Sequence, residues 1–541
     1  MKKYIILSLL GLVTISCRLD DNLTPNKVLA DQLSPSFRLG GASTDAYRVL
    51  AGNGLTVGST GNGAGLNALG NAWTNTWSGN FAQYGNPYTT ESDLDITTSY
   101  RQIIFTDFYK AITRLQRVID YGAAQANYAA IAKIQKAFYM QYVVDLYGNV
   151  PYTEAFQESA NPTPKYDKDV DIYKALVQEL LDAKSLISTY GTNGNFKVEA
   201  LSDPIFKGNM AKWNEFANTV LLKFAIRMSN TSDAQGIALR NQIISSLAGA
   251  TFISADVAIN PGYSSGTAAA QNPLYNAFGK FTSAGSSNTN GYLLMTASDH
   301  AIKSLQGDPS KATSGVSDPR ISAKFTTGKM YNNTSAGGAT GYYGFPQGMT
   351  NDDYKVFMGY TVNGRKPVIE NFSFLAGMFS ASTGTGSASN GYLMMLAESE
   401  FLHSEAALRG YAGFSGDQIH FEKGVQASFN FDGKTTDAAG YITSIASNPK
   451  VGWTGTNDDK IAAIQYQRWV ALMGYNGAES YINYLRTGYP ETPLATTATK
   501  PNKPWRLLYP ADEYSANGAN VPVVSQSQCF TKNEFTPFIF K

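Results

Sequence analysis

The sequence has little of the chemistry that usually marks a catalytic or metal centre. It contains two cysteines, Cys17 and Cys529, and three histidines in 541 residues, which excludes a cluster of thiolate ligands. The histidines lack the close spacing of a zinc motif, and the chain has no GxSxG or Walker sequence. The formal net charge is only +1, which argues against a nucleic-acid partner because such proteins need a basic face.

The chain also lacks an apolar run of the roughly 20 residues that a membrane-spanning helix requires. Residues 4–13 are mostly apolar, follow the basic head Met1-Lys2-Lys3 and precede Thr14-Ile15-Ser16-Cys17. We interpret residues 1–16 as a removable signal peptide. A small residue directly before a cysteine at this position resembles the bacterial lipobox, which implies that Cys17 is acylated and becomes the first residue of the mature chain.

Acidic residues follow this cysteine, at Asp20 and Asp21. They resemble the surface-export tag of Bacteroidetes lipoproteins, which implies a lipid-anchored protein on the surface of the outer membrane. Several acyl chains suffice as an anchor, since each buried methylene contributes about 0.8 kcal/mol. We expect a lipidated tether over residues 17–40, followed by one α-rich domain over 41–541. Cys529 then has no partner for an intrachain disulfide.

The regular segments of the chain are helical. Apolar residues recur at helical spacing in several stretches, and in the clearest of these Trp213, Phe216, Val220 and Phe224 share one face. The predicted helices are 99–121, 128–147, 169–188, 209–229, 234–248, 296–305, 391–410, 415–430, 458–473 and 477–486. Between about 250 and 390 the chain is rich in Gly, Ser, Thr and Asn, so we expect loops, short helices and a few short strands. The fold class is therefore mainly α, with helix pairs around a loop-rich insertion.

Aromatic residues are abundant, at 12% of the chain. Aromatic rings can stack on the apolar faces of sugars or contact peptides, and rings in Gly- and Asn-rich loops are more often exposed than rings in helices. The alternative for each is packing of its loop onto the helices. The candidate ligand-binding residues are Trp73, Trp77, Tyr84, Tyr88, Tyr275, Tyr292, Tyr342 and Tyr343.

Two glutamates, Glu398 and Glu405, lie on one face of a predicted helix. Seven residues at 1.5 Å each separate them by about 10 Å, near the upper limit for an inverting glycosidase pair. Their apolar surroundings favour buried structural bonds instead, with Arg227, Arg468 and Arg486 as candidate partners. No catalytic residue, cofactor or metal site is predicted. Runs of Asn and Asp at 351–353 and 456–459 could offer oxygen ligands to Ca²⁺, but they do not match the EF-hand loop.

Several segments resemble landmarks of one family, the SusD/RagB-like outer-membrane nutrient-binding lipoproteins of Bacteroidetes. They keep the family's order from about residue 90 to 520, and the RagB-like branch is the more similar. The landmarks are DLYGNVPYTEAF (145–156), AKWNEFANTVLLKFAIRMS (211–229), NPLYNAF (272–278), SDPRI (317–321), LAESEFLHSEAALRG (396–410), RWVALMGYNGAESYINYLRTGYP (468–490) and WRLLYPADEYSAN (505–517).

This resemblance implies a SusD-like fold with tetratricopeptide-like helix pairs and loops on the ligand face. It also implies a partner, a SusC-like TonB-dependent β-barrel transporter over which the lipoprotein acts as a lid. The resulting hypothesis is a non-enzymatic protein that captures an oligosaccharide or an oligopeptide. The alternatives are a surface glycoside hydrolase and an adhesion or scaffolding lipoprotein without a small ligand.

Overall fold

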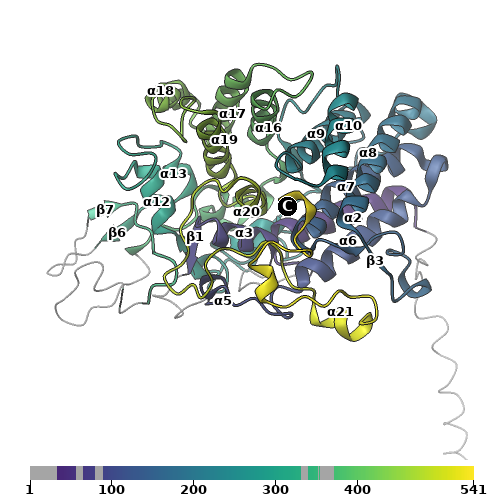
Figure 1. Ribbon diagram of the computed structural model, residues 1–541, viewed down its shortest axis with the longest axis horizontal. Helices are drawn as coiled ribbons and strands as arrows, with labels where there is room; N and C mark the ends of the chain where they lie inside the picture. The colour runs from purple at the N-terminus through teal and green to yellow at the C-terminus, as the bar shows by residue number, and fades with distance from the viewer. Residues whose placement is uncertain (1–32, 56–64, 80–88, 331–338, 351–352, 354–370) are drawn as a thin grey trace, which may run out of the picture.

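The computed structural model describes residues 33–55, 65–79, 89–330, 339–350, 353 and 371–541. Its first group of helices comprises α6 (Ile103–Ile119), α7 (Ala126–Tyr147), α8 (Asp169–Tyr190), α9 (Met210–Arg227) and α10 (Ala234–Ser246). Each packs against the next along the chain (Figure 1). Helix α7 is buried along nearly its whole length, so it forms the centre of this group. Gly148 ends α7 with a φ of 71°, a conformation that glycine adopts at little cost.

The second group comprises α16 (Leu396–Leu408), α17 (Asp417–Phe431), α18 (Ala438–Ile445), α19 (Asn457–Leu472) and α20 (Gly477–Thr487). Helix α16 packs on α17, α19 and α9 and so joins the two groups. The mainly α prediction is confirmed. Helix α18 was not predicted, and the other helices of the two groups lie close to their predicted ranges. Two of the predicted helices begin in strands: residues 296–297 belong to a strand rather than to the helix predicted over 296–305, and residues 391–394 form strand β8 rather than the start of α16. Pairing with β4 (Val257–Ile259) overrides the helical pattern there.

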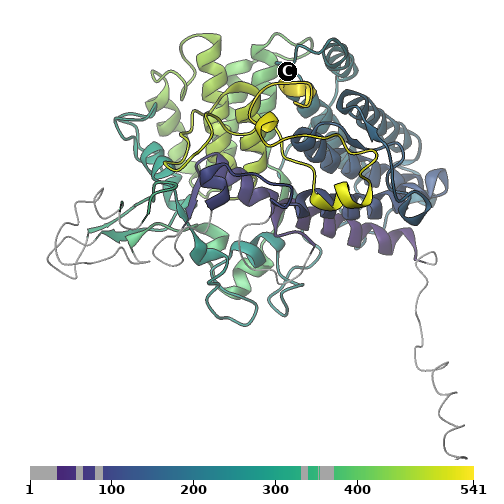
Figure 2. The ribbon, with the colours of Figure 1, turned by 60° about the horizontal axis from the view of Figure 1, so that its bottom comes forward.

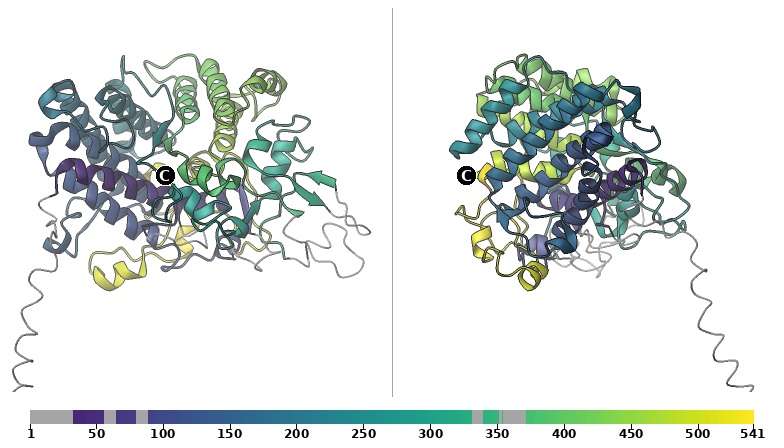
Figure 3. Two further views of the ribbon diagram at one scale, coloured as in Figure 1. Left: turned by 180° about the vertical axis from the view of Figure 1, so that it is seen from behind. Right: turned by 90° about the vertical axis from the view of Figure 1, so that its right-hand side faces the viewer.

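Two N-terminal helices were not predicted. Helix α2 (Pro35–Ala51) packs on α6 and α7, and it begins within the segment assigned to the tether (Figure 3). Helix α3 (Leu66–Trp73) packs on α20. Gly70 and Gly477 face each other at this crossing, and a Cβ on either glycine would overlap the backbone of the other helix. Helix α3 therefore ties the start of the domain to its last long helix.

In its described residues, the insertion between α10 and α16 contains only short elements. Strand β1 (Trp77–Gly79) pairs with β5 (Met295–Ala297), which joins the N-terminal segment to the insertion. The remaining pairs of strands are also antiparallel. The other short elements of the insertion are α11 (Pro273–Phe278), α12 (Asp299–Gln306), α13 (Ile321–Lys324), β6 (Gly328–Met330), β7 (Ala339–Gly341) and α15 (Thr383–Ala388). Short elements outside it are α5 (Thr89–Asp93), β2 (Val150–Pro151), β3 (Tyr166–Asp167) and α21 (Ala511–Ala516). The C-terminal segment, yellow in Figure 2, crosses the face where the two helix groups meet.

Six buried charges hold the helices of both groups together. Glu479 on α20 lies 2.8 Å from Arg227 on α9 and 3.1 Å from Arg468 on α19. It also pairs with Lys223 of α9. Arg468 reaches Glu398 on α16 at 2.6 Å, and Arg227 reaches Asp145 on α7 at 3.0 Å. Three carboxylates thus meet three cations, which offsets the cost of burying each charge alone.

A second buried pair lies beside these six charges. Arg486 of α20 donates to Glu405 Oε2 at 2.7 Å, and Gln465 of α19 donates to the same oxygen at 2.9 Å. The prediction that Glu398 and Glu405 make structural bonds to Arg468 and Arg486 is confirmed. Arg227, the third candidate cation, pairs instead with Asp145 and Glu479. Among the described residues, no helix is both long and apolar enough to cross a membrane.

Candidate ligand-binding site

The two candidate tryptophans lie in the core. Trp73 on α3 is 3% exposed and packs 5.0 Å from the ring of Tyr481, and Trp77 on β1 is 1% exposed and packs 5.2 Å from Phe278. Both were expected in an exposed loop, and that expectation is wrong. The Gly- and Asn-rich sequence around them contains a short helix and a strand, whose pairing with α20 and β5 buries both rings.

The candidate tyrosines of the insertion divide into two groups. Tyr275 and Tyr292 are buried, and their hydroxyls donate to the carbonyls of Ala381 and Leu375 at 3.1 and 3.0 Å. The expectation that these two rings are exposed is wrong as well, because each satisfies its hydroxyl within the fold. Tyr342 and Tyr343 follow β7 and are half-buried, so they stay candidates for ligand contact. Cys17, Tyr84 and Tyr88 lie outside the described residues.

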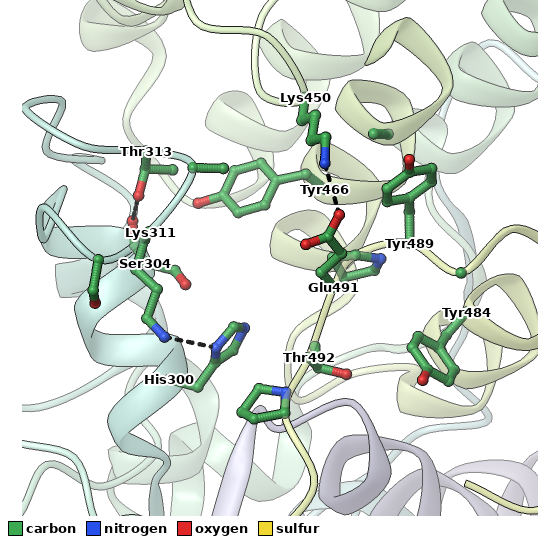
Figure 4. Close-up of a pocket in the computed structure, with 16 residues that line it drawn as sticks. His300, Ser304, Lys311, Thr313, Lys450, Tyr466, Tyr484, Tyr489, Glu491 and Thr492 are labelled. Atoms are coloured by element: carbon green, nitrogen blue, oxygen red, sulfur yellow. Dashed lines mark hydrogen bonds and ion pairs between the residues drawn. The ribbon is translucent and has the colours of Figure 1, made fainter. Parts of the chain in front are cut away.

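A pocket of about 480 Å³ opens between α12, α19 and the end of α20 (Figure 4). One wall is α12 with the loop that follows it. The opposite wall is the loop directly after α20, with Tyr466 of α19 between the two. The lining residues are His300, Ser304, Ser310, Lys311, Ala312, Thr313, Lys450, Ala462, Tyr466, Tyr484, Gly488, Tyr489, Pro490, Glu491, Thr492 and Pro493.

Three tyrosines give the pocket its apolar surfaces. Tyr484 and Tyr489 are half-buried at the end of α20 and in the loop behind it. The Tyr489 hydroxyl donates to Asp458 Oδ2 at 2.7 Å, which fixes the ring at the pocket's edge. Tyr466 is deeper, only 6% exposed. Rings held in this way offer stacking surfaces at little entropic cost, since few rotamers are lost on binding.

The polar groups of the pocket come from both walls. Lys311 Nζ donates to His300 Nδ1 at 3.2 Å, and Lys450 lies 2.7 Å from Glu491 Oε1. Burial, and then the positive charges of Lys311 and Lys503, lower the pKa of His300 to about 3. His300 is therefore neutral at physiological pH, and its Nδ1 accepts the lysine proton. Its other ring nitrogen then carries a proton and can donate to a ligand.

A buried lysine supports the wall behind Thr492. Lys503 is 3% exposed, donates to the Thr492 carbonyl at 3.2 Å and to its hydroxyl, and lies 4.0 Å from the Tyr484 ring centroid. Burial lowers the pKa of Lys503 to about 7, because no carboxylate offsets the loss of water around it. The amine thus places part of a positive charge next to the pocket.

A second hollow, of about 620 Å³, lies between α2 and α6. It adjoins Leu33, where the described chain begins. Its charges are already engaged: Arg117 lies 2.8 Å from Glu158, and Arg114 pairs with Asp45. The hollow therefore offers fewer unengaged polar groups than the pocket beside α12.

No metal site is found among the described residues, since no three His, Cys, Asp or Glu side chains come together there. The run at 456–459 has another role. Thr456 caps α19, its hydroxyl accepts from the Asp459 amide, and the Asp459 carboxylate accepts from the Thr456 amide. This reciprocal capping box gives Asp459 a role that needs no cation. Of the run at 351–353, only Asp353 is described.

A protein-family model described as "Starch-binding associating with outer membrane", SusD-like, matches residues 64–510. The chain belongs to the SusD-like family. The resemblance seen in the ordered landmarks is therefore confirmed. A search of curated proteins finds no match.

Solved SusD-like structures share the fold at low sequence identity. A Bacteroidetes AC2a SusD-like protein is 20% identical, with a TM-score of 0.68 over 94% of this chain and 99% of that one. A chitin-binding SusD homologue from Flavobacterium johnsoniae is 20% identical, with a TM-score of 0.67 over 92% and 97%. A SusD homologue from Bacteroides fragilis is 18% identical, with a TM-score of 0.67 over 94% and 100%.

One family landmark contributes directly to the pocket. The sequence RTGYP runs from Arg486 to Pro490; its arginine is buried against Glu405, while Gly488 to Pro490 line the pocket. Sequence reasoning used this segment for recognition and did not consider it for binding. The available signal of a binding residue was Tyr489, which lies between a glycine and a proline. Gly488 ends the helix with a φ of 80°. Lys311 and Lys503 had no such signal, because only the fold brings them to the same site.

Proposed function

We propose that this SusD-like protein is a surface lipoprotein, anchored in the outer membrane through acylated Cys17, that captures an oligosaccharide. The observation that carries the proposal is the pocket beside α12, where tyrosine rings and hydrogen-bonding side chains line one cavity. That combination suits a sugar, which presents apolar C–H faces and a rim of hydroxyls. The family model's description and the chitin-binding homologue support a glycan over a peptide.

Capture without catalysis is part of the proposal. The two glutamates that could suggest a hydrolase are buried and bonded to Arg468 and Arg486. Neither lines the pocket. A glycosidase needs one carboxyl group held protonated and a second one facing the sugar. We therefore expect no hydrolysis of any oligosaccharide that the protein binds.

Binding is tested by calorimetry of the mature chain against a panel of oligosaccharides. The variant Tyr489→Ala removes a stacking ring worth about 1 kcal/mol, so we expect roughly five- to tenfold weaker binding. Tyr342→Ala and Tyr343→Ala test the remaining aromatic residues of the insertion in the same assay. Tyr190→Ala, at the distant end of α8, is the matched control. Wild-type affinity in Tyr489→Ala would show that the oligosaccharide binds at another place on the protein.

Two further elements of the proposal concern location and partner. We infer a signal peptide over residues 1–16, a tether behind Cys17 and a SusC-like TonB-dependent barrel for which the protein acts as a lid. Labelled palmitate should enter the wild type and not Cys17→Ala, which should leave the membrane fraction. Mild detergent extraction should recover a large β-barrel with the tagged wild-type chain. Recovery of the chain alone, without any barrel, would contradict the lid role.

A further inference from the structure

Each carboxylate around the pocket is engaged by a partner other than Lys311. Lys450 pairs with Glu491 at 2.7 Å, and Lys303 pairs with Asp299 at 2.8 Å. Asp458 accepts from the Tyr489 hydroxyl, and Asp459 belongs to the capping box of α19. Asp308 accepts from the Ser310 amide at 2.8 Å. Among the described residues, none of these carboxylates forms an ion pair with Lys311.

Lys311 has a neutral partner instead. Its Nζ bonds to a neutral imidazole, at 3.2 Å from His300 Nδ1, rather than to a carboxylate. Burial lowers the pKa of Lys311, and the charges of Asp299 and Asp308 offset this only in part, as expected for an amine that loses water without a directly bonded carboxylate. Figure 4 shows Lys311 extending along the pocket wall to His300, opposite the side that carries Tyr484 and Tyr489. An anionic group between these walls would meet the ammonium directly.

Two other groups point to the same kind of ligand. The Tyr466 hydroxyl is buried and has no hydrogen-bond partner among the described residues. Burial keeps it protonated by raising its pKa well above the usual value, so it is an unused donor. Figure 4 shows this hydroxyl on the side of the pocket where Thr313 and Lys311 lie. Behind the opposite wall, Lys503 adds positive potential through Thr492.

We propose that the pocket recognises an acidic sugar, with its carboxylate or sulfate bound by Lys311, His300 and Tyr466 and its ring against Tyr484 and Tyr489. This proposal rests on the proposed function and specifies its ligand class. Lys311, His300 and Tyr466 all donate hydrogen bonds, and the acceptor oxygens of one carboxylate or sulfate can accept from all three. A neutral sugar would leave the Lys311 charge uncompensated in a half-enclosed site.

The test is an array of neutral, uronate-bearing and sulfated oligosaccharides probed with the mature chain. The tightest acidic ligand is then compared with its neutral form: the methyl ester for a uronate, or the desulfated sugar for a sulfate. We expect at least tenfold tighter binding of the acid and a loss of that preference at high salt. Lys311→Met should remove the preference for the acid over its neutral form. Lys212→Met, an exposed lysine on α9, should bind as the wild type does.

The outcomes separate this inference from the proposed function. If only neutral sugars bind, and Tyr489→Ala weakens them, the acidic specificity is refuted and sugar capture stands. If no sugar binds but an acidic peptide does so through Lys311, the proposed function fails. If acid and neutral form bind equally, or if Lys311→Met retains the preference while its melting temperature is unchanged, the assignment of the pocket to an anion is refuted.

Discussion

Replacing Lys503 by methionine should change how the stability of the protein depends on pH. In the folded protein burial lowers the pKa of this amine from 10.5 to about 7. Between these two values the unfolded chain binds a proton that the folded protein does not, so the free energy of unfolding rises with pH. The cost of the buried amine is present in full below pH 7 and disappears above pH 10.5.

The size of the effect follows from the shift. One pKa unit corresponds to about 1.4 kcal/mol. Near pH 7 the folded amine is itself partly protonated, so the free energy of unfolding rises by less than this amount over the first pH unit. The Lys503 contribution between pH 7 and pH 9 is therefore about 2 kcal/mol. Methionine keeps the length of the side chain and removes the charge. The wild type should thus gain about 2 kcal/mol more than Lys503→Met over this interval.

Urea unfolding of the mature chain at several pH values between 6 and 9.5 measures this difference. Lys212→Met, an exposed substitution, shows whether loss of any lysine has the same effect. Parallel plots of unfolding free energy against pH for the wild type and Lys503→Met would refute the reasoning. They would mean that water or a counter-charge reaches the amine and that Lys503 adds no unusual potential beside the pocket.

Three further predictions concern the buried pairs and the helix crossing. Burial raises the pKa of Glu405, but Arg486 and Arg409 outweigh burial and lower it to about 2. Between pH 5 and pH 3 the free energy of unfolding of the wild type should therefore fall by about 2 kcal/mol more than that of Glu405→Gln. Equal decreases in urea titrations would contradict this. Glu479→Gln leaves two buried guanidinium groups without their shared carboxylate, so the free energy of unfolding, measured by calorimetry or urea, should fall by about 3–5 kcal/mol. A decrease below 1 kcal/mol would rule out a structural role for the six charges. Gly477→Ala places a Cβ against the α3 backbone and should cost about 1–3 kcal/mol or more, whereas Gly440→Ala, where nothing lies near the added Cβ, should cost far less in the same assay.

The long helices could be predicted from sequence because their apolar faces repeat at helical spacing. Helix α9, with Trp213, Phe216 and Val220 on one face, was placed within two residues at each end. Helices α2 and α3 were missed for a physical reason. Helix α2 is rich in Gly, Ser and Ala and α3 in Ala and Asn, and both gain their burial from distant partners on α6 and α20, which a local pattern does not reveal.

The candidate site shows the same limit more strongly. Composition correctly indicated that aromatic residues are abundant, but it could not separate the buried rings of Trp73 and Trp77 from the half-buried rings of Tyr484 and Tyr489. The two walls of the pocket come from segments more than 150 residues apart, as His300 and Tyr484 illustrate. Their approach depends on the packing of the insertion against α19 and α20, and no spacing within either segment encodes it.

A crystal structure of the mature chain with its tightest-binding oligosaccharide tests the central claim most directly. We predict a sugar ring against Tyr484 and Tyr489, with an anionic group within hydrogen-bond distance of Lys311 Nζ and the Tyr466 hydroxyl. A sugar bound at Tyr342 and Tyr343, or anywhere else, with the pocket beside α12 empty would contradict the claim.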